Sequence, residues 1–301
     1  MWFKNLYLYQ FEKEFDQDAD TLHDALSKKP FTDCSATQRE SMGWIPPLGK
    51  KSEAYSHAVN NFILLTMARQ ERLLPASVVR EELQERVIEI QERESRRVGS
   101  KEKKELTERI EDELLPRAFT RTQKLDAWID LKGGWLVVNT SSSTRAENFA
   151  TLLRKTIGSL PVVPVKTEAV SPVLTDWLSN YKLPEPFEIG DECEMKSLGD
   201  DAGIASFRKH ELGTDEVKSN IETGKVVSKL ALIWDRKISF VVSDDMVVKK
   251  LKFLDVLEEK MNEEDPQSHE ERVDIEFTLM TGELSKLIPD LNGQFNSNKD
   301  K

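Results

Sequence analysis

The chain has 301 residues, of which 38% are hydrophobic and 32% charged, with a formal net charge of −11 at pH 7. This length allows two domains or one elaborated body with a substantial core, and the hydrophobic content excludes a disordered chain. The acidic balance argues against nonspecific adhesion to an acidic polymer unless the cations are concentrated in patches. Lys and Arg do gather in residues 96–104, 117–124 and 225–252, so local charge decides the partners.

The two cysteines, Cys34 and Cys193, are far apart, and neither has a second Cys or a His at metal-ligand spacing. We therefore expect both to be reduced and expect no metal or other cofactor. No stretch has the apolar length needed to cross a bilayer, and no signal peptide opens the chain. A cytoplasmic location without membrane contact is the expectation.

The first part of the chain predicts a sheet with one helix. Residues 2–11 alternate as a strand, which would be either an edge strand or a pairing surface for a second copy. Residues 18–28 predict a short helix with acidic residues early and lysines at its end. Residues 42–49 read as a turn-rich loop around two prolines, and residues 58–69 contain a buried strand at residues 62–65.

Residues 77–121 are the stretch around which the rest of the chain is organised. Apolar residues recur there at the spacing of one narrow helical face, first at Val79, Leu83, Val87 and Ile90, and then at Leu106, Ile110 and Leu114. Gly99 is a plausible helix stop and Ser100 a plausible N-cap for the second helix. We therefore predict a helical hairpin that projects from a globular body.

The predicted turn of this hairpin is basic. It carries a single anion, Glu102, against five cations, which are Arg96, Arg97, Lys101, Lys103 and Lys104. Two interpretations stay open: a phosphate-binding tip, or a charged helix surface that only meets solvent.

After the hairpin, two strands at residues 125–131 and 135–139 are joined through Gly133 and Gly134. Residues 143–157 predict a helix, and the prolines of residues 160–165 favour an edge strand or a connector. Beyond a boundary near residues 167–172, the pattern alternates between helices and short strands. We expect helices at 173–181, 214–222 and 253–261, strands at 193–198, 204–210, 226–234, 238–243 and 273–280, and a last helix that opens at 281–283.

This order indicates an α+β fold with two lobes of mixed or antiparallel sheet and a projecting helical hairpin. The predicted domains are a discontinuous central domain (residues 1–75 and 117–168), the hairpin tip (residues 76–116) and a C-terminal domain (residues 169–301).

No catalytic set stands out, and we expect a protein that is not an enzyme. One arrangement keeps an alternative open, because Asp191, Glu194 and Lys196 are similar to the acidic–x–Lys pattern of metal-dependent nucleases. In that pattern, paired carboxylates hold Mg²⁺ while the lysine steadies the attacking water.

Binding of phosphate is the other chemistry that the sequence offers. On a strand, Arg117, Phe119 and Arg121 would share one face, so that the aromatic ring could lie against a sugar or a splayed base. The alternative is that Phe119 belongs to the core.

A second basic row is predicted further along the chain. Lys225 and Lys229 have the same strand parity, and Arg208 and Lys209 could extend their row, with His210 as a further polar contact. Such faces lack an aromatic cluster or an array of base-reading amides, which suggests contact with the DNA backbone without sequence reading.

Six dispersed blocks, in unchanged order over nearly the whole chain, resemble the recombination-associated protein RdgC family. They are residues 2–5 (WFKN), 42–47 (MGWIPP), 114–119 (LLPRAF), 158–164 (GSLPVVP), 224–232 (GKVVSKLAL) and 279–284 (LMTGEL).

This resemblance implies an α+β homodimer that closes into a ring around double-stranded DNA. It also implies nonspecific DNA binding that obstructs RecA function, and hence homologous recombination, on the bacterial nucleoid. The hairpin would then reach the partner subunit and close the ring. The resemblance implies a DNA-binding role for Arg117, Phe119, Lys225 and Lys229, which lie inside matching blocks. The cations of the hairpin turn are assigned to DNA binding from their charge alone.

A ring would reconcile the charge balance, because an acidic exterior maintains solubility while a cationic lining focuses potential on the hole. Closure needs two contacts related by twofold symmetry. We predict that the first strand or the C-terminal lobe supplies the firm contact and the hairpin tip the weaker one. The alternatives are the nuclease above and a protein-binding scaffold, such as a direct RecA ligand, that has no affinity for DNA.

Overall fold

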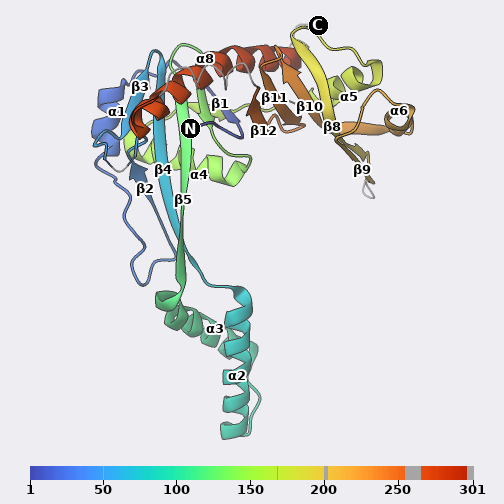
Figure 1. Ribbon diagram of the computed structural model, residues 1–301. Coiled ribbons are helices and arrows are strands. Elements are labelled where there is room, and N and C mark those ends of the chain that lie inside the picture. Colours follow the sequence, from blue (N-terminus) through green and yellow to red (C-terminus); the bar gives the residue numbers. More distant parts are fainter. Residues whose placement is uncertain (50, 168, 200–202, 255–265, 297–301) are drawn as a thin grey trace.

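The computed structural model describes residues 1–49, 51–167, 169–199, 203–254 and 266–296 (Figure 1). These residues form an α+β fold with two antiparallel sheets. The first sheet has the order β2-β4-β5-β6-β1-β7, and β3 pairs with β4 in line with β2. Its strands are β1 (Tyr7–Phe11), β2 (Glu40–Ile45), β3 (Ser56–Val59), β4 (Phe62–Leu73), β5 (Phe119–Asp130), β6 (Trp135–Val138) and β7 (Val162–Pro164).

The second sheet is built entirely from the C-terminal part of the chain and has the order β12-β11-β10-β8-β9. Its strands are β8 (Phe187–Ser197), β9 (Ile204–Arg208), β10 (Lys225–Trp234), β11 (Ile238–Ser243) and β12 (Val248–Phe253). Helices α5 (Val170–Asn180) and α6 (Asp215–Glu222) pack against β10. The N-terminal segment joins the two sheets, because Leu6 and Val248 exchange backbone hydrogen bonds of 2.9 and 3.1 Å.

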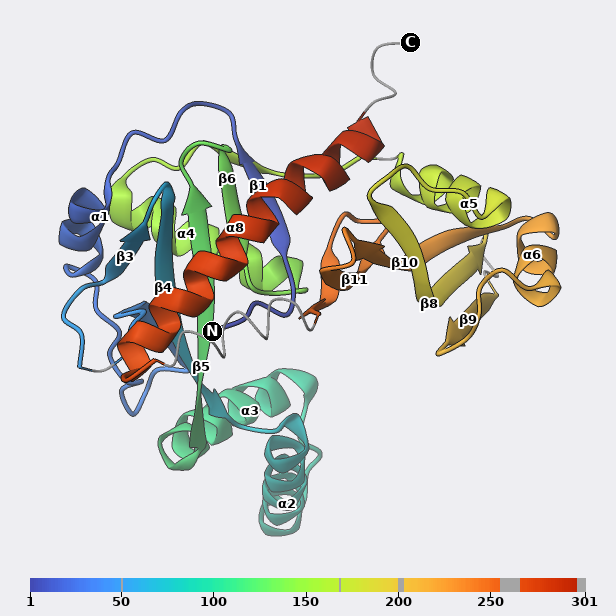
Figure 2. The same ribbon diagram turned by 45° about the horizontal axis from the view of Figure 1, so that its top comes forward.

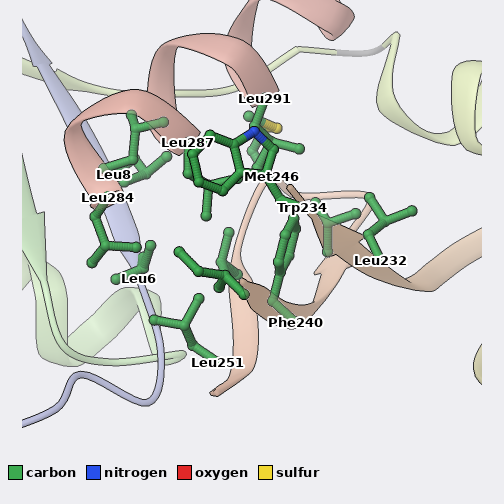
Figure 3. Packing of buried hydrophobic residues seen from close by; sticks show 14 of the residues in the cluster. Leu6, Leu8, Leu232, Trp234, Phe240, Met246, Leu251, Leu284, Leu287 and Leu291 are labelled. Carbon is green, nitrogen blue, oxygen red and sulfur yellow. The ribbon is translucent and has the colours of Figure 1, made fainter. Parts of the chain in front are cut away.

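Helix α8 (His269–Asn296) lies across both sheets (Figure 2). Its buried leucines meet Leu8 of β1 and the preceding Leu6 on one side, and Leu232, Trp234 and Phe240 of the second sheet on the other (Figure 3). The Trp234 indole N–H also donates to Asp290 Oδ2 of this helix at 3.0 Å. One continuous core therefore connects the two sheets under a single helix.

The prediction of a strand at residues 273–280 followed by a new helix at 281–283 was wrong. Val273, Phe277, Met280 and Leu284 are buried on one face of a continuous helix, at spacings of three and four. Thr281 does not cap a helix start, because its hydroxyl donates to the Phe277 carbonyl within the same helix.

The opposite face of the first sheet is covered by α1 (Ala19–Leu26) and α4 (Ser143–Ile157), the two helices predicted at residues 18–28 and 143–157. Trp44 of β2 packs edge-on against Phe149 of α4, with ring centroids 5.3 Å apart. The stretch at residues 42–49, predicted as a loop, therefore begins as a strand. Gly43 permits this, since a Cβ there would lie 2.4 Å from the Phe31 Cα atom of the neighbouring chain segment.

Strand β1 is not an edge strand. It lies between β6 and β7, and Tyr7, Leu8 and Tyr9 are buried. The prediction that this strand is free to pair with a second copy was therefore wrong; β7 takes the edge position instead, as its prolines indicated. The predicted helix at residues 253–261 begins with Phe253, which belongs to β12, and residues 255–261 lie outside the described part of the chain.

The predicted helical hairpin is present as α2 (Ala76–Glu94) and α3 (Ser100–Leu114), followed by the short helix η1 (Leu115–Arg117). It extends from the ends of β4 and β5, and the β8–β9 hairpin extends in the same direction at the other end of the molecule, so that the chain forms an arch (Figure 1). Arg86 of α2 binds Glu113 of α3 at 2.6 Å.

The helix boundaries at the hairpin turn differ from the prediction by a few residues. Ser95 ends α2 in the left-handed conformation (φ 51°), and Gly99 is the N-cap of α3 with Ser100 as its first residue. Both cysteines are free and buried. Within the described ranges, no helix combines the length and the apolar character needed to span a membrane.

Candidate nucleic-acid interface

The base of the helical hairpin exposes an aromatic ring beside a guanidinium. Phe119 opens β5 opposite Leu73 of β4, and 84% of its surface is accessible. The interpretation of Phe119 as a core residue is therefore excluded. Arg121 lies two residues along the same strand and pairs with Glu71 at 2.5 Å. Arg117 is exposed but belongs to η1, so it does not share the strand face as predicted.

Arg72, which sequence reasoning missed, holds this region in place. Its guanidinium donates to the carbonyls of Leu115 and Ala118 at 3.3 and 3.2 Å, and to that of Ser35 at 3.1 Å. It lies in a run of alternating charges on β4, and nothing in that pattern distinguishes a cation that binds backbone carbonyls from one that meets solvent.

Of the five cations predicted for the tip, Arg96 and Arg97 lie in the turn between α2 and α3, whereas Lys101, Lys103 and Lys104 belong to the start of α3. Arg96 donates two hydrogen bonds of 2.7 Å to the Glu102 carboxylate and a third to Glu94, so its charge is compensated within the hairpin. The remaining four side chains are exposed, namely Arg97, Lys101, Lys103 and Lys104.

Lys225 and Lys229 do not form one row, and the prediction that they share a face was wrong. Val227 is paired with Met195, whereas Lys229 is paired with Glu194, so β10 advances two residues while β8 advances one. Such a bulge interrupts the alternation of a strand. Lys229 consequently lies on the side of Glu194, while the Lys225 ammonium donates to Asn220 Oδ1 of α6 at 2.9 Å.

The face of the second sheet that α5, α6 and α8 leave uncovered is rich in charge. We call it the open face; it carries the ion pairs Lys229–Glu194 (2.8 Å), Lys196–Asp244 (2.5 Å), Lys250–Glu192 (2.6 Å) and Arg208–Glu192 (3.8 Å). Lys209 follows β9 with a positive φ of 51°. The His210 Nδ1 atom lies 2.7 Å from the Glu211 carbonyl oxygen, and its Nε2 atom lies 3.8 Å from the Glu216 carboxylate.

A broad hollow of about 930 Å³ lies on the open face. Ala231, Ile233 and Val241 contribute apolar lining, and Lys250 and Lys252 lie beside them. These two lysines were not among the predicted site residues. Because β12 was not predicted as a strand, the alternation of its side chains between the two faces of the sheet could not be used to place these lysines.

Two of the three residues of the nuclease alternative, Glu194 and Lys196, are engaged with other partners. The Glu194 carboxylate accepts hydrogen bonds from Lys229 and Ser228, and the hydrogen bond from Lys229 is the main cause that lowers its pKa. Lys196 binds Asp244. Across the ranges that the structure describes, no three His, Cys, Asp or Glu side chains are grouped so that they could hold a metal ion.

The predicted residues thus form three groups, at the hairpin turn, at the hairpin base and on the second sheet. Residues 1–298 match the family described as "Putative exonuclease, RdgC". The chain belongs to the RdgC family. RdgC proteins named "Recombination-associated protein RdgC" are similar to it along their whole length. The protein of Psychromonas ingrahamii is 40% identical over 290 residues, which are 96% of each chain.

Two further RdgC relatives agree with this match. Those of Tolumonas auensis and Yersinia enterocolitica are 39% and 38% identical over 292 residues, which cover 97% of this chain and 97% and 96% of theirs. The curated relatives carry the name of a recombination-associated protein, whereas the description of the RdgC family names an exonuclease.

Proposed function

We propose that this RdgC-family chain binds double-stranded DNA through its phosphates, without reading the sequence, as a homodimer closed into a ring. The proposal rests on the placement of exposed cations along an arch. The helical hairpin carries one group of cations, and the open face of the second sheet carries another. A chain with a net charge of −11 binds an acidic polymer only where its cations are collected in this way.

The proposed DNA-binding residues remain those derived from the sequence. Phosphate contacts would come from the cations of the three groups, and the exposed ring of Phe119 would lie against sugar or base. Since phosphates repeat regardless of base, binding of this kind is indifferent to sequence. We propose that occupation of the duplex restrains RecA on the nucleoid by competition for DNA.

The internal position of β1 leaves the C-terminal lobe as the proposed source of the firm dimer contact. Leu198 and Ile204 support this, because they lie at the end of the β8–β9 hairpin with 77% and 69% of their surfaces exposed. The hairpin tip (within residues 76–116) would form the weaker contact, joining the central part (1–75 and 117–168) of one subunit to its partner.

The direct test is a mobility-shift assay that measures binding to a random-sequence duplex over a range of salt concentrations. A steep negative slope of log affinity against log salt is expected, and Lys229→Gln should reduce it by less than one, because Glu194 already pairs with this lysine. Electron-microscope images of the purified protein should show rings of two subunits. A flat salt dependence, or monomers with no ring, would contradict the proposal.

The family description and the shared face of Glu194 and Lys196 favour one second candidate, a Mg²⁺-dependent nuclease. The same protein should then nick plasmid DNA when Mg²⁺ is added. Nicking that is lost in Glu194→Gln would support the nuclease. DNA that stays intact when all of it is bound would contradict the nuclease and support a protein that only binds DNA.

A further inference from the structure

The cations proposed to meet DNA are already held by carboxylates of the same chain. On the open face, Lys229 pairs with Glu194 at 2.8 Å and Lys250 pairs with Glu192 at 2.6 Å. Glu192 also lies 3.8 Å from Arg208. At the hairpin base, Arg121 pairs with Glu71 in the same manner. Each of these pairs joins side chains of different strands, so the carboxylates are fixed by the sheet.

The carboxylate is the less exposed member of each pair. Glu192 is 21% exposed, against 56% for Lys250 and 70% for Arg208. Glu194 is likewise less exposed than Lys229. The carboxylates therefore lie beneath the cations and cancel part of their charge, while the more exposed cations face the surface at which a phosphate would arrive.

We infer that Glu192 and Glu194 act as built-in competitors of the DNA phosphates and hold the affinity of the open face below what its cations could supply. This inference rests on the proposed DNA binding. A carboxylate and a phosphate compete for the same ammonium or guanidinium, because both are oxygen anions that accept charge-assisted hydrogen bonds. A cation that is already paired neutralises less phosphate charge, so fewer counterions leave the DNA and the cation contributes less to affinity.

The opposite role would be to hold the cations in position for phosphate. An unpaired lysine loses more side-chain freedom on binding, so removal of the acid would then weaken binding. The two roles predict opposite signs. The charge effect should dominate here, because Glu192 faces two cations and cancels part of the charge of each.

The test is to measure DNA affinity and salt dependence for Glu192→Gln and Glu194→Gln. Each variant should bind a random-sequence duplex about three- to tenfold more tightly, and its salt slope should become more negative by up to about 0.9 for each cation released. Glu147→Gln is the matched control, because it changes the net charge equally on the exposed side of α4. It should alter affinity far less than either test variant.

A double-substitution cycle separates release of a paired cation from a general change in charge. Glu194→Gln should tighten binding in the wild-type chain but have little effect in Lys229→Gln, because the cation it frees is then absent. An equal gain in both backgrounds, or weaker binding in either glutamine variant, would overturn the inference. A wild-type protein that does not bind DNA would instead overturn the proposed function, so the two failures are distinguishable. Thermal unfolding should confirm that all variants are folded.

Discussion

Phe119 and Leu73 lie opposite each other where the helical hairpin leaves the first sheet, and both are exposed, by 84% and 42%. A cross-strand apolar pair of this kind normally contributes to a core or to an interface. Here the paired strands β4 and β5 have extended beyond the helices that cover their other ends (Figure 1). The ladder therefore fixes the backbone of Phe119 while its ring is open to a partner.

The first prediction is that Phe119→Ala separates function from stability. Because the side chain is exposed, its removal should change the free energy of unfolding by less than about 0.5 kcal/mol, while DNA binding or dimer formation should weaken. Phe149→Ala is the control, since Phe149 is fully buried and its loss should cost about 3–5 kcal/mol. Chemical denaturation and a binding assay on both variants check this. Unchanged DNA binding together with an unchanged dimer would contradict the role of Phe119.

The second prediction concerns the stability of the helical hairpin by itself. Ile110 of α3 is fully buried, and it lies outside the two hydrophobic clusters that fill the sheets. Ile110→Ala should therefore loosen α2 and α3 by about 2–5 kcal/mol while the sheets keep their stability. Hydrogen exchange should accelerate in residues 76–114 only. Ile88→Ala, at a position that is 53% exposed on α2, should leave exchange unchanged.

Much of the fold could be predicted because the decisive patterns are local. The helix at residues 143–157 was predicted with the bounds that the structure has, and the helical hairpin and the β10–β11 hairpin were predicted within a few residues. These elements combine a regular apolar period with turn or cap residues at their ends.

The errors arise where the three-dimensional surroundings decide. Helix α8 carries the half-buried Ile275 and Leu279 beside its buried stripe, so apolar residues alternate over residues 273–279 as they would in a strand. The bulge beside Ser228 is invisible in the sequence, although it moves Lys229 to the opposite face from Lys225. The exposure of Phe119 depends on how far β4 and β5 extend, which no local pattern reveals.

The third prediction tests whether α8 connects the two sheets. Leu287 is fully buried in the cluster shared by both sheets, so Leu287→Ala should lower the free energy of unfolding by about 2–5 kcal/mol in a single transition. Denaturant unfolding followed by tryptophan fluorescence should show a lower midpoint with an unchanged slope. Lys286→Ala, an exposed neighbour, should have little effect. Two separate transitions in the Leu287 variant would show that the sheets unfold independently.

The last prediction is a pH dependence that arises from Asp126 of β5. Burial raises the pKa of this carboxyl above its ordinary value of 3.8, although the Thr66 hydroxyl donates to its Oδ1 atom at 2.7 Å. The folded protein therefore holds this proton more tightly than the unfolded chain. As the pH rises from 3.8 through the folded pKa, the contribution of this group to stability must fall, and above that range the charged form carries the full penalty.

Asp126→Asn keeps an oxygen acceptor for Thr66 but cannot ionise. The variant should therefore be more stable than the wild type at pH 7, and its advantage should shrink as the pH is lowered toward 3.8. Denaturant midpoints of both proteins between pH 4 and pH 8 measure this difference, in which the titration of all other groups largely cancels. Asp112→Asn, at an exposed position on α3, is the control for the loss of one carboxylate. A wild type that gained stability over the variant as the pH rose would mean that the ionised carboxylate, favoured by Lys124 and the Thr66 hydroxyl, outweighs the cost of burial.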